Sequence, residues 1–124
     1  MDLVEYQLIL LRAPAAAPAY PEPEENRIQR EHLAFYEAQR AAGHVLTNGP
    51  MRDQPDRTLR GLAIFAVGSL ERAAELARAD PAVLAGALEV EAMNWWCRPG
   101  TMTAPGRLFT LPDPVSQGDS SAMP

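Results

Sequence analysis

His32 and Asp80 are the side chains of this sequence best suited to proton transfer. An imidazole titrates near neutral pH, so it can give or take a proton under ordinary conditions. His32 lies in a helical pattern that places five residues on one face: Ile28, His32, Phe35, Gln39 and Ala42. The histidine therefore points inward, where a satisfied core histidine and a proton shuttle are alternative interpretations.

Asp80 is followed by Pro81, and this pair predicts the end of one helix and the start of another. A residue before proline avoids the helical region, whereas Asp at the N-cap and Pro at the first helical position favour a new turn. The capping role explains the pair by itself. Because a cap leaves one carboxylate oxygen free, we also predict that Asp80 reaches His32 and orients its ring.

Four further residues are candidates for contact with a substrate. Gly49 and Pro50 end a strand, and a glycine there lets backbone amides approach an anionic ligand, although a plain strand end explains them too. Tyr6 and Trp96, together with other aromatic side chains, offer faces to a flat organic molecule. Packing in the core explains the aromatic residues equally well.

The charged residues restrict the partners of the chain. Its net charge of −5 argues against a nucleic-acid-binding protein, which needs clustered positive charge. All eleven basic residues are arginine, which we interpret as a composition bias. Arginine also gives planar, bidentate recognition of carboxylates, so Arg60 is a candidate substrate-binding residue near Arg52 and Arg57. Solvated loop charges are the alternative interpretation of all three.

No metal, cofactor or membrane segment is predicted. A metal site would require His32 and His44 to converge with a carboxylate, and no tight ligand spacing supports one. No apolar run approaches the ~20 residues that span a bilayer. Cys97 is the only cysteine, which excludes an intrachain disulfide and favours a cytoplasmic location. With Arg98 as its one charged neighbour, Cys97 is not predicted to be a nucleophile.

Hydrophobic periodicity predicts four strands, two helices and a short helical turn that position these residues. A proline-rich loop over residues 12–24, long enough to form a flap over a pocket, follows the first strand. The expected elements are strands over 4–11, 44–51, 59–67 and 87–96, helices over 24–42 and 70–79, and a turn over 81–85. Their order, β-α-β-β-α-β, predicts an α+β, ferredoxin-like domain within residues 1–97 and a C-terminal tail over 98–124.

The predicted sheet has more apolar surface than two helices can cover. Both helices of a ferredoxin-like unit lie on one face of the sheet. The third strand nevertheless carries apolar residues on both faces: Leu62, Ile64 and Ala66 on one, Ala63, Phe65 and Val67 on the other. Because a large exposed apolar face needs a partner, we predict a homodimer.

Several short motifs, in this order, resemble the YciI-like (YCII-related) family of the dimeric α+β barrel superfamily. They are His32-Leu33-Ala34, Gly43 to Leu46 with Gly49-Pro50, Gly61, Ala79-Asp80-Pro81 and Ala85-Gly86. The resemblance covers about residues 4–96 and implies a pocket where a histidine and an aspartate act as acid and base, here His32 and Asp80. The chain departs from the family in its longer proline-rich loop, its tail, and Ala82 where a bulky aromatic residue often stands.

The resemblance, together with the residues, predicts a small cofactor-independent enzyme. Related barrels include isomerases, dehydrochlorinating lyases and cofactor-free oxygenases. We expect an isomerase or lyase that performs acid–base chemistry on a small organic substrate, aromatic or carboxylate in character, in a pocket around His32. The alternative is a homodimer without catalytic activity that binds a small molecule or a protein partner. A pocket beside His32 would favour the enzyme, and a fully enclosed His32 the alternative.

Overall fold

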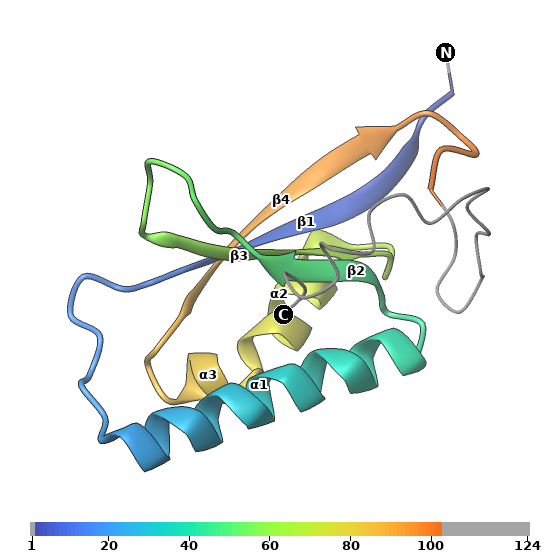
Figure 1. The fold of residues 1–124 in the computed structure, drawn as a ribbon. Coiled ribbons are helices and arrows are strands. Elements are labelled where there is room, and N and C mark those ends of the chain that lie inside the picture. The colour runs from blue at the N-terminus through green and yellow to red at the C-terminus, as the bar shows by residue number, and fades with distance from the viewer. Residues whose placement is uncertain (1, 103–124) are drawn as a thin grey trace, which may run out of the picture.

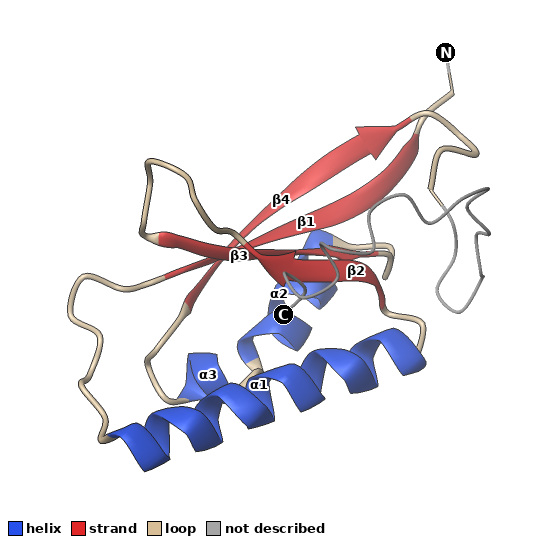
Figure 2. Ribbon diagram, in the orientation of Figure 1, coloured by secondary structure: helices blue, strands red, loops and turns tan. Residues whose placement is uncertain are grey.

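The computed structural model describes residues 2–102, in which one sheet carries all helices on the same side (Figures 1 and 2). Adjacent strands, in the order β2-β3-β1-β4, pair antiparallel throughout. This is the ferredoxin-like arrangement, so the predicted fold class is confirmed. The elements are β1 (Val4–Arg12), α1 (Glu22–Ala41), β2 (Val45–Pro50), β3 (Leu59–Phe65), α2 (Leu70–Arg78), α3 (Pro81–Leu84) and β4 (Glu89–Cys97).

The division into a domain over 1–97 and a tail over 98–124 stays a prediction, because residues 103–124 lie outside the described part of the chain. Within residues 2–102, none of the helices combines the length and the apolar character that crossing a bilayer requires.

Helix α1 begins earlier than predicted. Its N-cap is Pro21 and its first residue is Glu22, so the last residues assigned to the proline-rich loop belong to the helix. Proline is tolerated in the first turn because the amide it lacks would have no partner within the helix. Acidic side chains in this turn also suit the positive end of the helix dipole. The other end follows the prediction, with Gly43 at a φ of +84° just after the C-cap.

The inward face of α1 also differs from the predicted stripe. Tyr36 is the most deeply buried residue of this helix, at 1% exposure, whereas Ala42 is exposed. The Tyr36 ring meets those of Phe35 and Phe65 edge to face, with centroids 5.1 and 6.2 Å apart. The stripe is therefore rotated toward Tyr36, because large aromatic rings gain more from burial than the small Ala42 does.

The core lies between the helices and one face of the sheet. Alternation along β1 places Ile9 and Leu11 on this face, and α2 covers the sheet with two fully buried alanines, Ala73 and Ala77. The opposite face is apolar as well, and no helix of the described residues lies over it (Figure 2). Its cross-strand pairs include Leu8 with Ile64, Leu8 with Met93, and Leu10 with Leu62.

Candidate functional site

The structure brings His32 and Asp80 together, as the sequence predicted. His32 projects from α1, and Asp80 is the N-cap of α3, so the two come from segments 48 residues apart. Their side chains meet with His32 Nδ1 2.7 Å from Asp80 Oδ2. The Asp80 side chain is completely buried, whereas that of His32 keeps 15% of its surface exposed. The distance is that of a direct hydrogen bond, and a catalytic role for the pair stays a prediction.

Each oxygen of the Asp80 carboxylate has a partner. Oδ1 accepts a hydrogen bond from the amide of Ala82 at 2.9 Å, which is the cap predicted from the Asp-Pro pair. Oδ2 faces His32. An ionised carboxylate can only accept, so an imidazole that pairs with it through Nδ1 carries a proton on that nitrogen. The other nitrogen, Nε2, is then left with a lone pair on the side of the ring that points away from Asp80.

Tyr36 supports the imidazole from one turn further along α1. Its ring stands edge to face with that of His32, at a centroid distance of 5.3 Å and an interplanar angle of 65°. Burial raises the pKa of the Tyr36 hydroxyl far above its usual value, and the Asp80 carboxylate raises it further. This hydroxyl is buried with no hydrogen-bond partner among the described residues. The signal for this support was the spacing of four residues from His32, which places both rings on one helix face.

His32 opens into a cleft with a volume of about 1260 Å³. The cleft lies between the first half of α1 and the ends of β2 and β3, and the loops over 13–20 and 51–58 contribute to its walls. Asp80 lies behind His32 and is not part of the wall. His32 therefore contributes to the wall of the cleft, and its carboxylate partner does not. Its apolar lining residues include Leu11, Ile28, Leu33, Leu59 and Leu88.

Three of the five predicted substrate-binding residues line this cleft, namely Gly49, Pro50 and Arg60. Tyr6 and Trp96 do not. Tyr6 lies five residues before Leu11 on β1 and on the opposite face of the sheet, where it pairs with Trp95. Trp96 is 53% exposed near the end of β4. The sheet itself therefore separates Tyr6 from the space beside His32, whereas Trp96 is separated by its position at the end of β4, opposite the start of β1.

Gly61 shapes the wall where β2 and β3 meet. A Cβ atom at this position would lie 3.1 Å from the carbonyl oxygen of Gly49 in the neighbouring strand. The same Cβ would come within 3.7 Å of the Leu11 side chain. A side chain at 61 would therefore push the strands apart at the edge of the cleft, which gives a physical reason for glycine there.

The proline-rich loop forms a fixed wall of the cleft. Near its start, the Ala13 amide donates to the carbonyl oxygen of Thr58 at 2.8 Å. At its far end, the Tyr20 hydroxyl donates to the carbonyl oxygen of Ala85 at 2.6 Å. Pro18 packs on the turn after α3, since its ring carbons lie 3.3 Å from the position of a Cβ on Gly86. These contacts anchor the loop at both ends, unlike a flap.

His44, the other histidine, lies away from this site. Its Nδ1 pairs with Oε1 of Gln39 at 2.9 Å, and it does not line the cleft. Within residues 2–102, no three histidine, cysteine or acidic side chains gather closely enough to hold a metal ion. The cleft presents the His32 imidazole beside apolar and arginine-bearing walls.

Comparisons with known proteins place this geometry in context. The family model of the YCII-related domain matches residues 5–96. Among solved structures, the chain is similar to 5-chloro-2-hydroxyhydroquinone dehydrochlorinase (TftG) from Burkholderia phenoliruptrix AC1100, in complex with 2,5-dihydroxybenzoquinone. The two are 20% identical with a TM-score of 0.49, and the similarity covers 73% of this chain and 92% of that chain. No curated protein matches the sequence.

Proposed function

Because this chain belongs to the YCII-related domain family, we propose that it is a small enzyme that transfers a proton on a small organic substrate, with His32 as general acid and base. The observation that supports this most directly is the contact of His32 Nδ1 with the buried Asp80 carboxylate at 2.7 Å. The contact fixes the tautomer, and the remaining nitrogen is available to a substrate in the cleft.

The proposed reaction begins with Nε2 of His32 taking a proton from a carbon of the substrate. The electron pair of the broken C–H bond remains on the substrate, as a carbanion or an enolate, and the imidazole becomes positively charged. Asp80 then stabilises the imidazolium as an ion pair. In an isomerase the same proton returns to another atom of the substrate. In a lyase, a group on the adjacent carbon leaves with its bonding electrons as the double bond forms, and the imidazolium then releases its proton to the departing group or to water.

The proposed binding roles follow from the walls of the cleft. The strand end at Gly49 and Pro50 supplies a backbone surface, and the apolar side chains shield the reacting atoms from water. Arg60 supplies a positive charge at the same end of the sheet. A substrate held there has its reactive carbon facing the imidazole on the opposite wall.

Hydrogen exchange tests the proposal even while the product of the reaction is unidentified. The protein is incubated in D₂O with a panel of small ketones, quinols and carboxylic acids that have acidic C–H bonds. Loss of the substrate proton signal is followed by NMR. We expect exchange with at least one compound in the wild type, and a rate about 10²–10⁴-fold lower in His32→Gln, the usual range for general acid–base catalysis.

His44→Gln is the matched control for this experiment. It removes the other histidine, whose partner is a neutral amide outside the cleft, and its exchange rate should stay within about twofold of the wild type. Equal exchange in the wild type and in His32→Gln would refute the catalytic role of His32. A small molecule retained through native purification, with no exchange of any compound, would favour the alternative of a binding protein.

The assembly that we propose is a homodimer formed through the apolar face of the sheet. The residues that face away from the helices are the same in both copies, so a two-fold contact between these faces is self-complementary. Trp95 continues this face along β4 and is 41% exposed. Light scattering at micromolar concentration should give about twice the chain mass of 13.5 kDa. A mass of one chain would contradict the dimer.

A further inference from the structure

We propose that the cleft binds the carboxylate group of an organic acid through Arg52, Arg57 and Arg60. The inference rests on the proposed function in one respect: His32 would act on the same bound molecule. It adds the class of ligand and two residues to which no role has been assigned.

The three arginines line the cleft together with His32. Within residues 2–102, none of the three forms an ion pair or a side-chain hydrogen bond. Arginines elsewhere serve the structure, since four of them are paired with acidic side chains: Arg12, Arg27, Arg40 and Arg72. The other arginines of the described part do not line this cleft: Arg30, Arg78 and Arg98. Every arginine that lines the cleft therefore has a guanidinium group without an ion-pair partner among the described residues.

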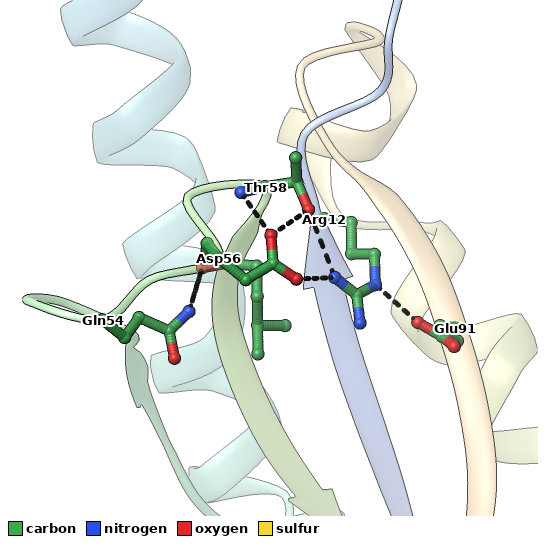
Figure 3. A network of polar contacts seen from close by, with 6 residues as sticks. Arg12, Gln54, Asp56, Thr58 and Glu91 are labelled. Carbon is green, nitrogen blue, oxygen red and sulfur yellow. Dashed lines mark hydrogen bonds and ion pairs between the residues drawn. The ribbon is translucent and has the colours of Figure 1, made fainter.

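The connection between β2 and β3, residues 51–58, is held by the network in Figure 3. Asp56 Oδ1 accepts hydrogen bonds from the amide and the hydroxyl of Thr58, at 3.0 and 2.6 Å. Asp56 Oδ2 pairs with Arg12 at 3.0 Å, and Arg12 also donates to Glu91 on β4 at 2.7 Å. Gln54 donates to the carbonyl oxygen of Asp56 at 2.7 Å. The connection is thereby tied to two strands of the sheet.

This network holds the backbone of the segment that carries Arg52 and Arg57. Arg52 and Arg57 belong to the tied connection, and Arg60 belongs to β3, where its carbonyl oxygen accepts from the Met51 amide at 2.9 Å. A loop that is already ordered loses less conformational entropy when a ligand binds. The network therefore serves the binding site as well as the fold, because it holds the backbone of this wall in place. The guanidinium groups themselves remain unpaired within the described part of the chain and available to a ligand.

The charges around the cleft favour an anion. The acidic residues on its walls are Glu25, Asp53 and Asp56, and the last of these is committed to Arg12. Of the described residues, the unpaired charged groups on the cleft walls are thus three guanidinium groups and two carboxylates. The cleft carries an excess of positive charge, although the net charge of the chain is −5. Guanidinium is planar and offers paired donors that match the two oxygens of a carboxylate. The apolar walls nearby suit the hydrocarbon part of the same molecule.

The test uses the full chain and the probe benzoate, with benzamide as its neutral counterpart of similar shape. Ligand-observed NMR titrations give the Kd of each. We expect benzoate to bind at least about tenfold more tightly than benzamide, and the triple variant Arg52→Gln/Arg57→Gln/Arg60→Gln to lose about tenfold or more in benzoate affinity. Arg30→Gln/Arg78→Gln/Arg98→Gln is the matched control, because it removes the same three charges outside the cleft, and its Kd should stay within twofold. Circular dichroism confirms that each variant is folded.

Several outcomes overturn the inference. These are no binding of benzoate to the wild type, equal binding of benzamide, or equal losses in the cleft variant and in its matched control. Displacement of benzoate by inorganic phosphate at an equal or lower concentration would show a general anion site in place of a carboxylate site. His32→Gln separates this inference from the proposed function, because it should abolish proton exchange while benzoate still binds at least about tenfold more tightly than benzamide. If only His32→Gln weakens benzoate binding, the anion binds at the imidazole and the arginine site is wrong.

Discussion

The two histidines of the chain use the same ring nitrogen in different surroundings. Nδ1 of His32 meets the buried carboxylate of Asp80 at 2.7 Å, and Nδ1 of His44 meets the amide oxygen of Gln39 at 2.9 Å. A carboxylate only accepts, so it fixes the proton on His32, whereas an amide can accept or donate and leaves the tautomer of His44 unfixed. Only His32 faces the cleft. What a histidine can do therefore depends on its hydrogen-bond partner and on the space beside its ring.

Asp80→Asn should have the largest effect, because it gives His32 an amide partner like that of His44. Asparagine caps a helix nearly as well as aspartate, so the fold should be retained. Its amide no longer forces the proton onto Nδ1 and no longer stabilises the imidazolium. The exchange rate should therefore fall about 10–100-fold, part of the range typical of general acid–base catalysis. The rate is measured in the D₂O assay, and an unchanged rate would show that the carboxylate does not act through His32.

Asp80→Ala tests the same comparison through stability. It removes the cap of α3, typically worth about 1 kcal/mol, and a hydrogen bond to a charged group, worth about 1.5–3 kcal/mol. The free energy of unfolding, measured with urea, should drop by about 2–4 kcal/mol. Gln39→Ala is the control at the other histidine, and it should cost less than about 1 kcal/mol, because a half-buried neutral pair is lost. Equal losses would remove the distinction between the two pairs.

Tyr36, which packs against His32, makes the stability of the fold depend on pH. Burial, followed by the Asp80 carboxylate, raises the pKa of its hydroxyl above the ordinary value of 10.0. Above about pH 10 the unfolded chain releases this proton while the folded chain keeps it, so stability present below that pH is lost as the pH rises. The expected loss is about 1.4 kcal/mol per pH unit. Urea titrations between pH 9 and 11 should show this slope in the wild type and a flatter one in Tyr36→Phe. Identical slopes would contradict the burial of the hydroxyl.

Features governed by local patterns were predictable from the sequence. Alternation placed the strands, and the Asp80-Pro81 pair marked both the end of α2 and the cap of α3. The meeting of His32 with Asp80 was predictable because helical spacing turned one inward and the fold brings α3 beside α1. Each of these conclusions rests on neighbours in sequence or on the common topology of the βαββαβ order.

Features that depend on long-range placement could not be predicted. The sequence offered Tyr6 and Trp96 as substrate contacts, but Tyr6 lies on the opposite face of the sheet and Trp96 at the far end of β4, so neither lines the cleft. The helix start at Glu22 was missed because proline ends helices in general and is tolerated only in their first turn. The link from Arg12 to Asp56 joins residues 44 positions apart, and only the folded chain shows which charges are committed.

The smallest expected effect belongs to Gln39→Glu, which gives His44 the kind of partner that His32 has. Glutamate would fix the proton on Nδ1 of His44, as Asp80 does for His32. Both residues are half-buried, so the new pair should add no more than about 1 kcal/mol. The negative charge near the C-terminus of α1 opposes the helix dipole and offsets part of that gain. Stability in urea should therefore change by less than about 1 kcal/mol, and the exchange rate should be unchanged because His44 does not reach the cleft. The double variant His32→Gln/Gln39→Glu provides a stricter test, and its exchange rate should be as low as that of His32→Gln alone. Any recovery of exchange would mean that a carboxylate partner makes a histidine active even outside the cleft.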